Sequence, residues 1–226
     1  MLVRCLILAF ALVTVLAICP SHAATIQWSD GEFNPANWEM TTILFDGNGG
    51  EGFATQVPNG GNPGAFRRIT ITVFSAPPYS GIVLFSRYLP ATYDPSTQGA
   101  LLEVEFDEDA VNLGSVAGGQ SSGPVIRQGG VAYVTDWYGI TQTVWTHHQL
   151  VHLTQSDFHL YGEHEHHPDF SESGGPMEFG FFRGNSTYSG GYTTICGIDN
   201  WSMILTTAEP TPAQAESWGR IKSLYR

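Results

Sequence analysis

Hydrophobic side chains recur at every second residue over much of this chain, and this period limits the fold more than any other feature. In the segment 66–74, Ile69, Ile71 and Val73 would lie on one face of a strand, with arginine and threonine side chains on the other. The segment 102–107 alternates in the same way between apolar and acidic residues. No long stretch has the 3.6-residue period of an amphipathic helix, so the pattern predicts an all-β fold.

Turn-forming residues divide the chain into many short strands. Glycine-rich clusters at 47–50, 118–119 and 190–191 separate the apolar runs. The whole glycine-rich run 47–64 lacks the Gly-Lys-Ser/Thr ending of a phosphate-binding loop, so it is interpreted as a plain loop. The other expected strands are 41–45, 81–88, 131–135, 140–153, 177–183 and 193–205. Many strands and few helices predict a two-sheet antiparallel β-sandwich of the jelly-roll type.

The N-terminal residues have the pattern of a secretory signal peptide. Arg4 is basic, the apolar run 6–18 is too short to span a bilayer, and Ser21-His22-Ala23 offers small residues where signal peptidase cleaves. We therefore expect a signal peptide over 1–23 and a mature protein that is secreted, periplasmic or at the cell surface. No membrane span is expected.

The rest of the chain is expected to hold one domain over 24–207, followed by a proline-containing linker and tail over 208–226. Without Arg4 the chain has eight basic and twenty-one acidic residues, a net charge of −13, which makes nucleic acid an unsuitable partner. Removal of the signal peptide leaves Cys196 as the only cysteine, so no internal disulfide is expected.

Two short segments resemble a known family. The opening Trp28-Ser29-Asp30-Gly31-Glu32-Phe33-Asn34, followed by Trp38, resembles the first strand of jelly-roll carbohydrate-binding modules with a galactose-binding-like fold. The segment Gly197-Ile198-Asp199-Asn200-Trp201-Ser202 is similar to their closing strand. Laminin-G and concanavalin-like sandwiches end in comparable strands, so these folds stay open as alternatives. The resemblance implies a non-catalytic module that binds a glycan or a cell-surface polysaccharide.

The same resemblance implies a structural calcium ion. In many such modules an acidic residue of the last strand holds calcium together with oxygen ligands near the first strand, and Asp199 matches the closing position. Asp30 and Glu32 are the expected partners from the opening segment, although Glu32 departs from the small polar residue expected there. The alternative is that Asp199 only accepts hydrogen bonds from loop amides.

Aromatic residues between strands are the candidates for sugar binding, because a sugar ring stacks its C–H face on an indole or phenol. Trp137 and Tyr138 lie between two expected strands, and Asp136 and Arg127 could supply hydrogen bonds around them. The alternative for Trp137 is packing against the sandwich. Trp38, Trp145 and Trp201 are assigned to the core.

A row of carboxylates allows a different function. Glu103, Glu105, Asp107 and Asp109 would project from one face of a strand, and concanavalin-like glycoside hydrolases carry their catalytic carboxylates in a similar Glu-x-Asp-x-Glu pattern. Asp109 stands where that family has glutamate. An aspartate side chain is one methylene shorter and would misplace the proton donor. A glycosidase is therefore the alternative to a binding module.

Seven histidines fall between residues 147 and 167, where imidazole groups suit zinc, copper or nickel. No His-Glu-x-x-His or Cys-x-x-Cys motif is present. His164, His166 and His167 stand between Gly162 and Pro168, in an expected exposed and mobile loop. A metal-binding or structural protein that uses this loop is a further alternative.

Overall fold

The structure is a computed structural model that describes residues 23–75, 78–114 and 119–209. Nearly all of the expected signal peptide, and the expected tail from residue 210, lie outside the described residues. None of the helices in the described part has the length and the apolar character needed to cross a bilayer.

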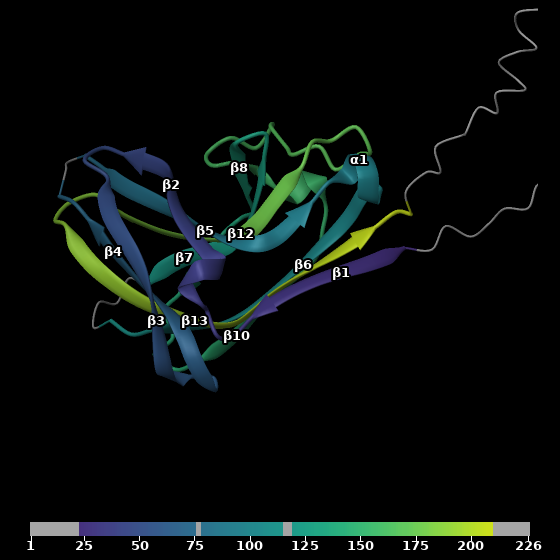
Figure 1. Cartoon of the computed structure of the whole chain (residues 1–226). Helices are drawn as coiled ribbons and strands as arrows, with labels where there is room; N and C mark the ends of the chain where they lie inside the picture. The colour runs from purple at the N-terminus through teal and green to yellow at the C-terminus, as the bar shows by residue number, and fades with distance from the viewer. Residues whose placement is uncertain (1–22, 76–77, 115–118, 210–226) are drawn as a thin grey trace, which may run out of the picture.

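Thirteen strands make up most of the described chain (Figure 1). They are β1 (Ala24–Asp30), β2 (Trp38–Asp46), β3 (Gly50–Gly61), β4 (Gly64–Val73), β5 (Ser80–Tyr93), β6 (Leu101–Asn112), β7 (Gln120–Gln128), β8 (Val131–Val134), β9 (Tyr138–Ile140), β10 (Thr146–Leu153), β11 (His159–Leu160), β12 (Met177–Thr187) and β13 (Tyr192–Thr207). The helical elements are η1 (Pro35–Asn37), α1 (Pro95–Gln98) and η2 (Gln155–Asp157).

The strands form two antiparallel sheets. Sheet A has the order β10-β6-β13-β4-β3, with β1 also paired to β13, and sheet B has the order β11-β8-β7-β12-β5-β2, with β9 paired to β7. The first and last strands run side by side, with Ala24 opposite Thr207 and Asp30 opposite Trp201 (Figure 1). The predicted two-sheet antiparallel sandwich is confirmed.

The core lies between the sheets and follows the alternation in the sequence. Ile69, Ile71, Val104 and Phe106 of sheet A are at most 1% exposed. They pack in one cluster with side chains of sheet B such as Phe181. Because a strand sends alternate side chains to opposite faces, each of these strands needs only every second residue to be apolar.

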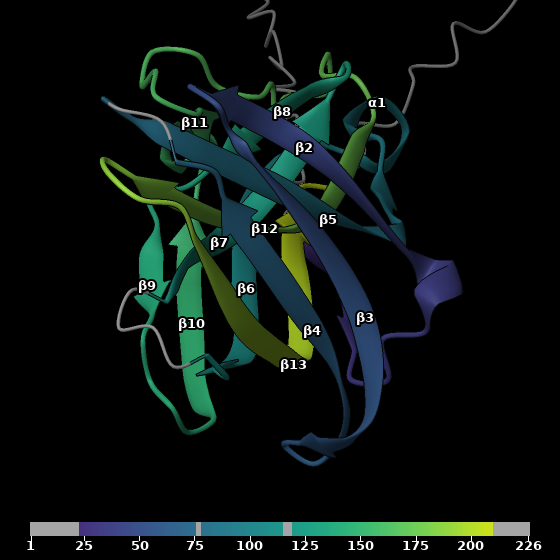
Figure 2. The ribbon, with the colours of Figure 1, turned by 90° about the vertical axis from the view of Figure 1, so that its left-hand side faces the viewer.

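The glycine-rich run 47–64 was wrongly interpreted as a loop, since most of it is β3. Glycine is required in this strand for packing. A β-carbon on Gly50 would lie 2.3 Å from the carbonyl oxygen of Thr72, and one on Gly52 would lie 2.2 Å from the side chain of Leu84. Strand β3 pairs with β4, and their hairpin extends beyond the rest of sheet A (Figure 2).

Sheet B also carries apolar side chains on the face that points away from sheet A. Val83, Phe85 and Phe182 are at most 2% exposed and belong to a cluster separate from the main core. Leu160 and Tyr161, at the end of β11 and just after it, line a hollow of about 470 Å³ together with residues of β2 and β8. The segment after β11 therefore lies against the outer face of sheet B.

Candidate functional site

Trp137 lies in the short connection between β8 and β9 and is 65% exposed. Its side chain borders a hollow of about 340 Å³ at the β7–β9 end of sheet B, here called the Trp137 groove. The other residues that line the groove are Gln120, Ser121, Gly139, Thr141, Tyr161, Gly184, Asn185, Ser186 and Tyr192. The alternative, that Trp137 is buried against the sandwich, is not what the structure shows.

The groove is polar but uncharged. No charged side chain is among the described residues that line it. The hydroxyl groups of Ser121, Thr141 and Ser186 make no hydrogen bond to another described side chain or backbone group, so they are free for a ligand. The single hydroxyl proton of Tyr192 is shared between the side-chain oxygen of Asn185 and, at 2.8 Å, the Ser186 carbonyl. This shared bond holds one wall of the groove in place.

A glycine keeps the floor of the groove open. Gly184 lies in β12 beside Ser121 of β7. A β-carbon at Gly184 would approach the Ser121 hydroxyl oxygen to 2.7 Å, closer than such contacts occur. The glycine thus leaves the Ser121 hydroxyl accessible from the groove.

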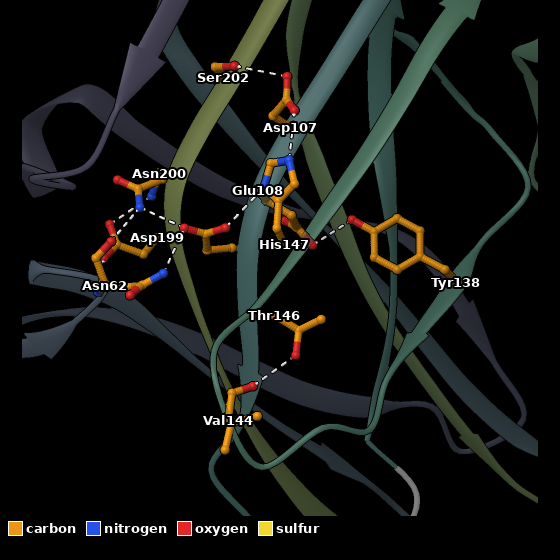
Figure 3. Close-up of polar contacts among 11 residues, drawn as sticks. Asn62, Asp107, Glu108, Tyr138, Val144, Thr146, His147, Asp199, Asn200 and Ser202 are labelled. Carbon is orange, nitrogen blue, oxygen red and sulfur yellow. Dashed lines mark hydrogen bonds and ion pairs between the residues drawn. The ribbon is translucent and has the colours of Figure 1, made fainter.

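Tyr138 was predicted to share a ligand with Trp137, but the structure places its ring on the inside. The ring stacks on His148, with centroids 4.6 Å apart, and its hydroxyl donates to Glu108 at 2.6 Å (Figure 3). Burial, and secondly the charge of Glu108, raise the pKa of Tyr138 well above its usual value. Tyr138 therefore anchors the β8–β9 connection and leaves Trp137 as its outward aromatic residue.

The two predicted polar partners of Trp137 do not line the groove either. Arg127 forms an ion pair with Glu178 at 2.5 Å and borders the separate hollow next to Tyr161. The Asp136 side chain is 94% exposed and faces His159. Of the four predicted ligand-binding residues only Trp137 lines the groove, and Tyr161 and Ser121, which also line it, were not predicted.

The acidic residues of β6 do alternate with buried residues, as predicted, but histidines pair with them. His152 lies 2.8 Å from Glu103. His147 lies between Asp107 and Asp109, with its Nε2 at 3.3 Å from the first and its Nδ1 at 3.0 Å from the second. Both carboxylates are thus paired with the imidazole, and Figure 3 shows the His147 ring next to Asp107.

Asp109 belongs to a hydrogen-bonded cluster with Asp199, which lies opposite it where β6 pairs with β13. Its carboxylate accepts hydrogen bonds from the side chains of Asn200 at 2.7 Å, His147 at 3.0 Å and Asn62 at 3.1 Å (Figure 3). Burial alone would raise the pKa of Asp109, but these three bonds lower it below its usual value.

The predicted calcium ligands Asp199, Asp30 and Glu32 are not a group of described residues whose ligand atoms all lie within 4.8 Å of one another. Asp199 accepts hydrogen bonds from the backbone amides of Asn62 and Asn200. Desolvation raises the pKa of Asp199, and the charges of Asp109 and Glu32 raise it further. The carboxylate of Asp30 instead accepts from the amides of Glu32 and Phe33 and from the Trp38 indole. A cation near Asp199 and Glu32 would offset the repulsion between these acids, and calcium at Asp199 stays a prediction.

If calcium binds here, removing it should lower the melting temperature by about 5–10 °C, because a ligand at about 100 times its Kd contributes roughly 2.7 kcal/mol. The measurement is a thermal melt after chelation and after addition of calcium, magnesium or zinc. Asp199→Ala should lose the response to calcium, whereas Glu51→Ala, at an exposed position of β3, should keep it. A melt that calcium does not change would mean that Asp199 only accepts amide hydrogen bonds.

No protein-family model and no curated protein matches the sequence. Among solved structures, it is similar to the family 11 carbohydrate-binding module of the cellulosomal cellulase Lic26A-Cel5E of Clostridium thermocellum, with 16% identity and a TM-score of 0.45 over 80% of this chain and 95% of that one.

Two other solved structures are similar to it over comparable lengths. A xylan-binding domain of family 22 gives 10% identity and a TM-score of 0.38, over 82% of this chain and 96% of the domain. A protein of unknown function from Shewanella oneidensis MR-1 gives 11% identity and a TM-score of 0.43, over 87% of this chain and 92% of that one.

Proposed function

We propose that this protein is a non-catalytic module that binds a neutral glycan in the Trp137 groove, outside the cytoplasm. The observation that carries the proposal is the exposed indole of Trp137 at the rim of an uncharged, hydroxyl-lined groove. An exposed indole offers a flat apolar face on which the C–H face of a sugar ring can stack, and a hollow with a few polar groups is the usual form of a small-ligand site.

The groove supplies both kinds of contact that a sugar needs. Trp137 and Tyr161 offer aromatic faces to the C–H groups of a pyranose ring. The free hydroxyls of Ser121, Thr141 and Ser186 can each donate and accept a hydrogen bond, which matches the hydroxyls of a sugar. Together they would fix both the position and the orientation of the ring.

Charge indicates which glycans would bind. The mature chain has a net charge of −13 and the groove contains no basic side chain. Sulfated or uronic-acid polymers would be repelled from such a surface and would find no counter-charge in the groove. Neutral oligosaccharides are therefore the ligand class that we infer.

Trp137→Ala should weaken binding about 5- to 30-fold, because stacking on one indole contributes roughly 1–2 kcal/mol. The measurement is calorimetry with a panel of neutral oligosaccharides, for which we expect Kd values on the order of micromolar to millimolar. The free energy of unfolding should stay within about 0.5 kcal/mol of wild type, because the indole is exposed.

Phe53→Ala is the matched control, since Phe53 is also an exposed aromatic residue, 54% exposed, but belongs to β3 of sheet A. It should bind the same oligosaccharide as tightly as wild type. Equal affinities of Trp137→Ala and wild type, or a preference for polyanionic over neutral glycans, would contradict the proposed site.

A further inference from the structure

A buried histidine next to the Trp137 groove has an unpaired ring nitrogen. His159 lies in β11, opposite Val134 of β8, and is 8% exposed. Its Nδ1 lies 2.9 Å from the carbonyl oxygen of Leu160, so Nδ1 carries the proton and donates to that oxygen. Its Nε2 is buried and makes no hydrogen bond to another described residue. A buried polar atom without a partner is costly, so this nitrogen calls for an explanation.

Two more metal-binding groups face this nitrogen. A carboxylate oxygen of Asp136 lies 3.5 Å from Nε2 of His159, and the ring of His164 lies 4.1 Å from the ring of His159. One ligand atom from each of the three residues lies within 4.8 Å of the other two. Three potential ligands from separate segments thus converge on one point.

With the proton on Nδ1, Nε2 of His159 can only accept a hydrogen bond, and so can the Asp136 carboxylate. The two groups therefore attract each other only when a positive charge lies between them. A charge-assisted hydrogen bond would be shorter, about 2.7–2.9 Å. Two ligands of a tetrahedral zinc ion, each about 2.0–2.2 Å from the metal, stand about 3.4 Å apart. The 3.5 Å separation is compatible with two ligands of one zinc ion.

Backbone hydrogen bonds hold the loop that carries His164. The amide of Glu163 donates to the Leu160 carbonyl at 3.0 Å, and the amide of Leu160 donates to the His166 carbonyl at 3.3 Å. His167 donates from its Nδ1 to the Phe158 carbonyl at 2.7 Å. The loop was expected to be solvated and without a fixed course, but these bonds turn it back over β11 and set His164 beside His159.

We propose that Asp136, His159 and His164 bind a divalent transition-metal ion, with zinc as the preferred ion. Two imidazoles and one carboxylate suit zinc, copper or nickel, whereas calcium and magnesium prefer sets made only of oxygen ligands. The hydrogen bond from Nδ1 of His159 to the Leu160 carbonyl orients the ring and fixes the tautomer. Metal-binding histidines usually make such a bond through the ring nitrogen that does not bind the metal.

Three protein ligands would leave a fourth position of a tetrahedral ion for water or another ligand. Asp136, His159 and His164 also line a hollow of about 210 Å³ together with Trp137 and Tyr161. The metal would also fix Asp136, the chain neighbour of Trp137, and so reduce the freedom of the indole at the rim of the groove.

The test is calorimetric titration of the untagged, chelator-treated full chain with zinc chloride, without glycan. We expect one zinc ion per chain at this site. Removing a ligand should raise the Kd for zinc by about 100-fold or more, since the loss of only a hydrogen-bond partner of a ligand lowers metal affinity by roughly 10- to 100-fold. His164→Ala decides the test, because His164 is exposed and the variant should fold; His159→Gln and Asp136→Asn should act in the same direction.

His166→Ala and His152→Ala are the matched controls, because each of these exposed histidines pairs with a glutamate outside the cluster. Both should bind zinc as wild type does. Cobalt in place of zinc should give the intense visible absorption of a four-coordinate site, and His164→Ala should abolish it. Absence of stoichiometric zinc binding, or binding that survives His164→Ala, would overturn the proposal. Because no glycan is present, failure of the glycan-binding site leaves the outcome unaffected.

Discussion

Arg183→Met should lower the free energy of unfolding by about 3–5 kcal/mol, because it leaves the buried carboxylate of Glu108 without its counter-charge. Arg183 is 1% exposed and Glu108 is fully buried, and Nη2 of the arginine lies 2.8 Å from a carboxylate oxygen. Methionine has a similar volume, so the loss comes mainly from the unpaired carboxylate and from the hydrogen bonds that Arg183 donates to Ser122 and to the Phe182 carbonyl. Urea denaturation measures it, provided that the m value is unchanged.

The double variant Glu108→Gln with Arg183→Met should recover most of this loss. Glutamine keeps an oxygen that can accept the hydrogen bonds from Tyr138 and Ser122, which now bind Glu108 at 2.6 and 2.9 Å. Arg68→Met, at an exposed position of β4, should change stability by less than about 0.5 kcal/mol. A double variant as unstable as the single one would show that the arginine stabilises the core by packing and not by its charge.

The sequence predicted the strands of the sandwich but not this buried pair. Periodicity identifies which face of a strand is apolar, and Val104 and Phe106 are buried as that rule requires. Glu108 continues the same inward face, although it is charged. Its partner Arg183 comes from the other sheet, 75 residues later in the chain. A contact between distant strands depends on register and topology, which one sequence does not contain.

The same limit explains which parts of the candidate site were predicted. Trp137 was found because an aromatic residue between two strands has a local signature. Tyr161 reaches the groove from the segment after β11, and nothing in its sequence surroundings shows that this segment folds over sheet B. His159 and His164 were counted among the histidines, but only the pairing of β11 with β8 brings them to Asp136.

The prediction of a loop over the glycine-rich run 47–64 was wrong for a different reason. Glycine lowers the propensity for a strand, so a local rule assigns 47–64 to a loop. In the structure, the close approach of β3 to Thr72 and Leu84 selects glycine at Gly50 and Gly52, and the ladder to β4 supplies the stability that propensity lacks. Tertiary packing here overrides local preference.

Trp201→Ala should lower the free energy of unfolding by about 3–5 kcal/mol, the usual loss when a large aromatic side chain is removed from a core. Trp201 is fully buried, and its ring lies 5.1 Å from those of Trp38 and Tyr88. Trp201→Phe should cost less, because the indole nitrogen has no hydrogen-bond partner among the described residues and phenylalanine removes that donor.

Comparison of Trp201→Phe with Trp137→Phe separates the aromatic residues that fold the domain from the one that binds. Trp201→Phe should lower the melting temperature and keep the affinity for a neutral oligosaccharide, because Trp201 belongs to the core between the sheets and does not line the groove. Trp137→Phe should keep the melting temperature and weaken binding, since a smaller ring offers less stacking area. Thermal melts and calorimetry on both variants measure the two effects, and a Trp137→Phe protein that loses stability with unchanged affinity would reverse the assignment.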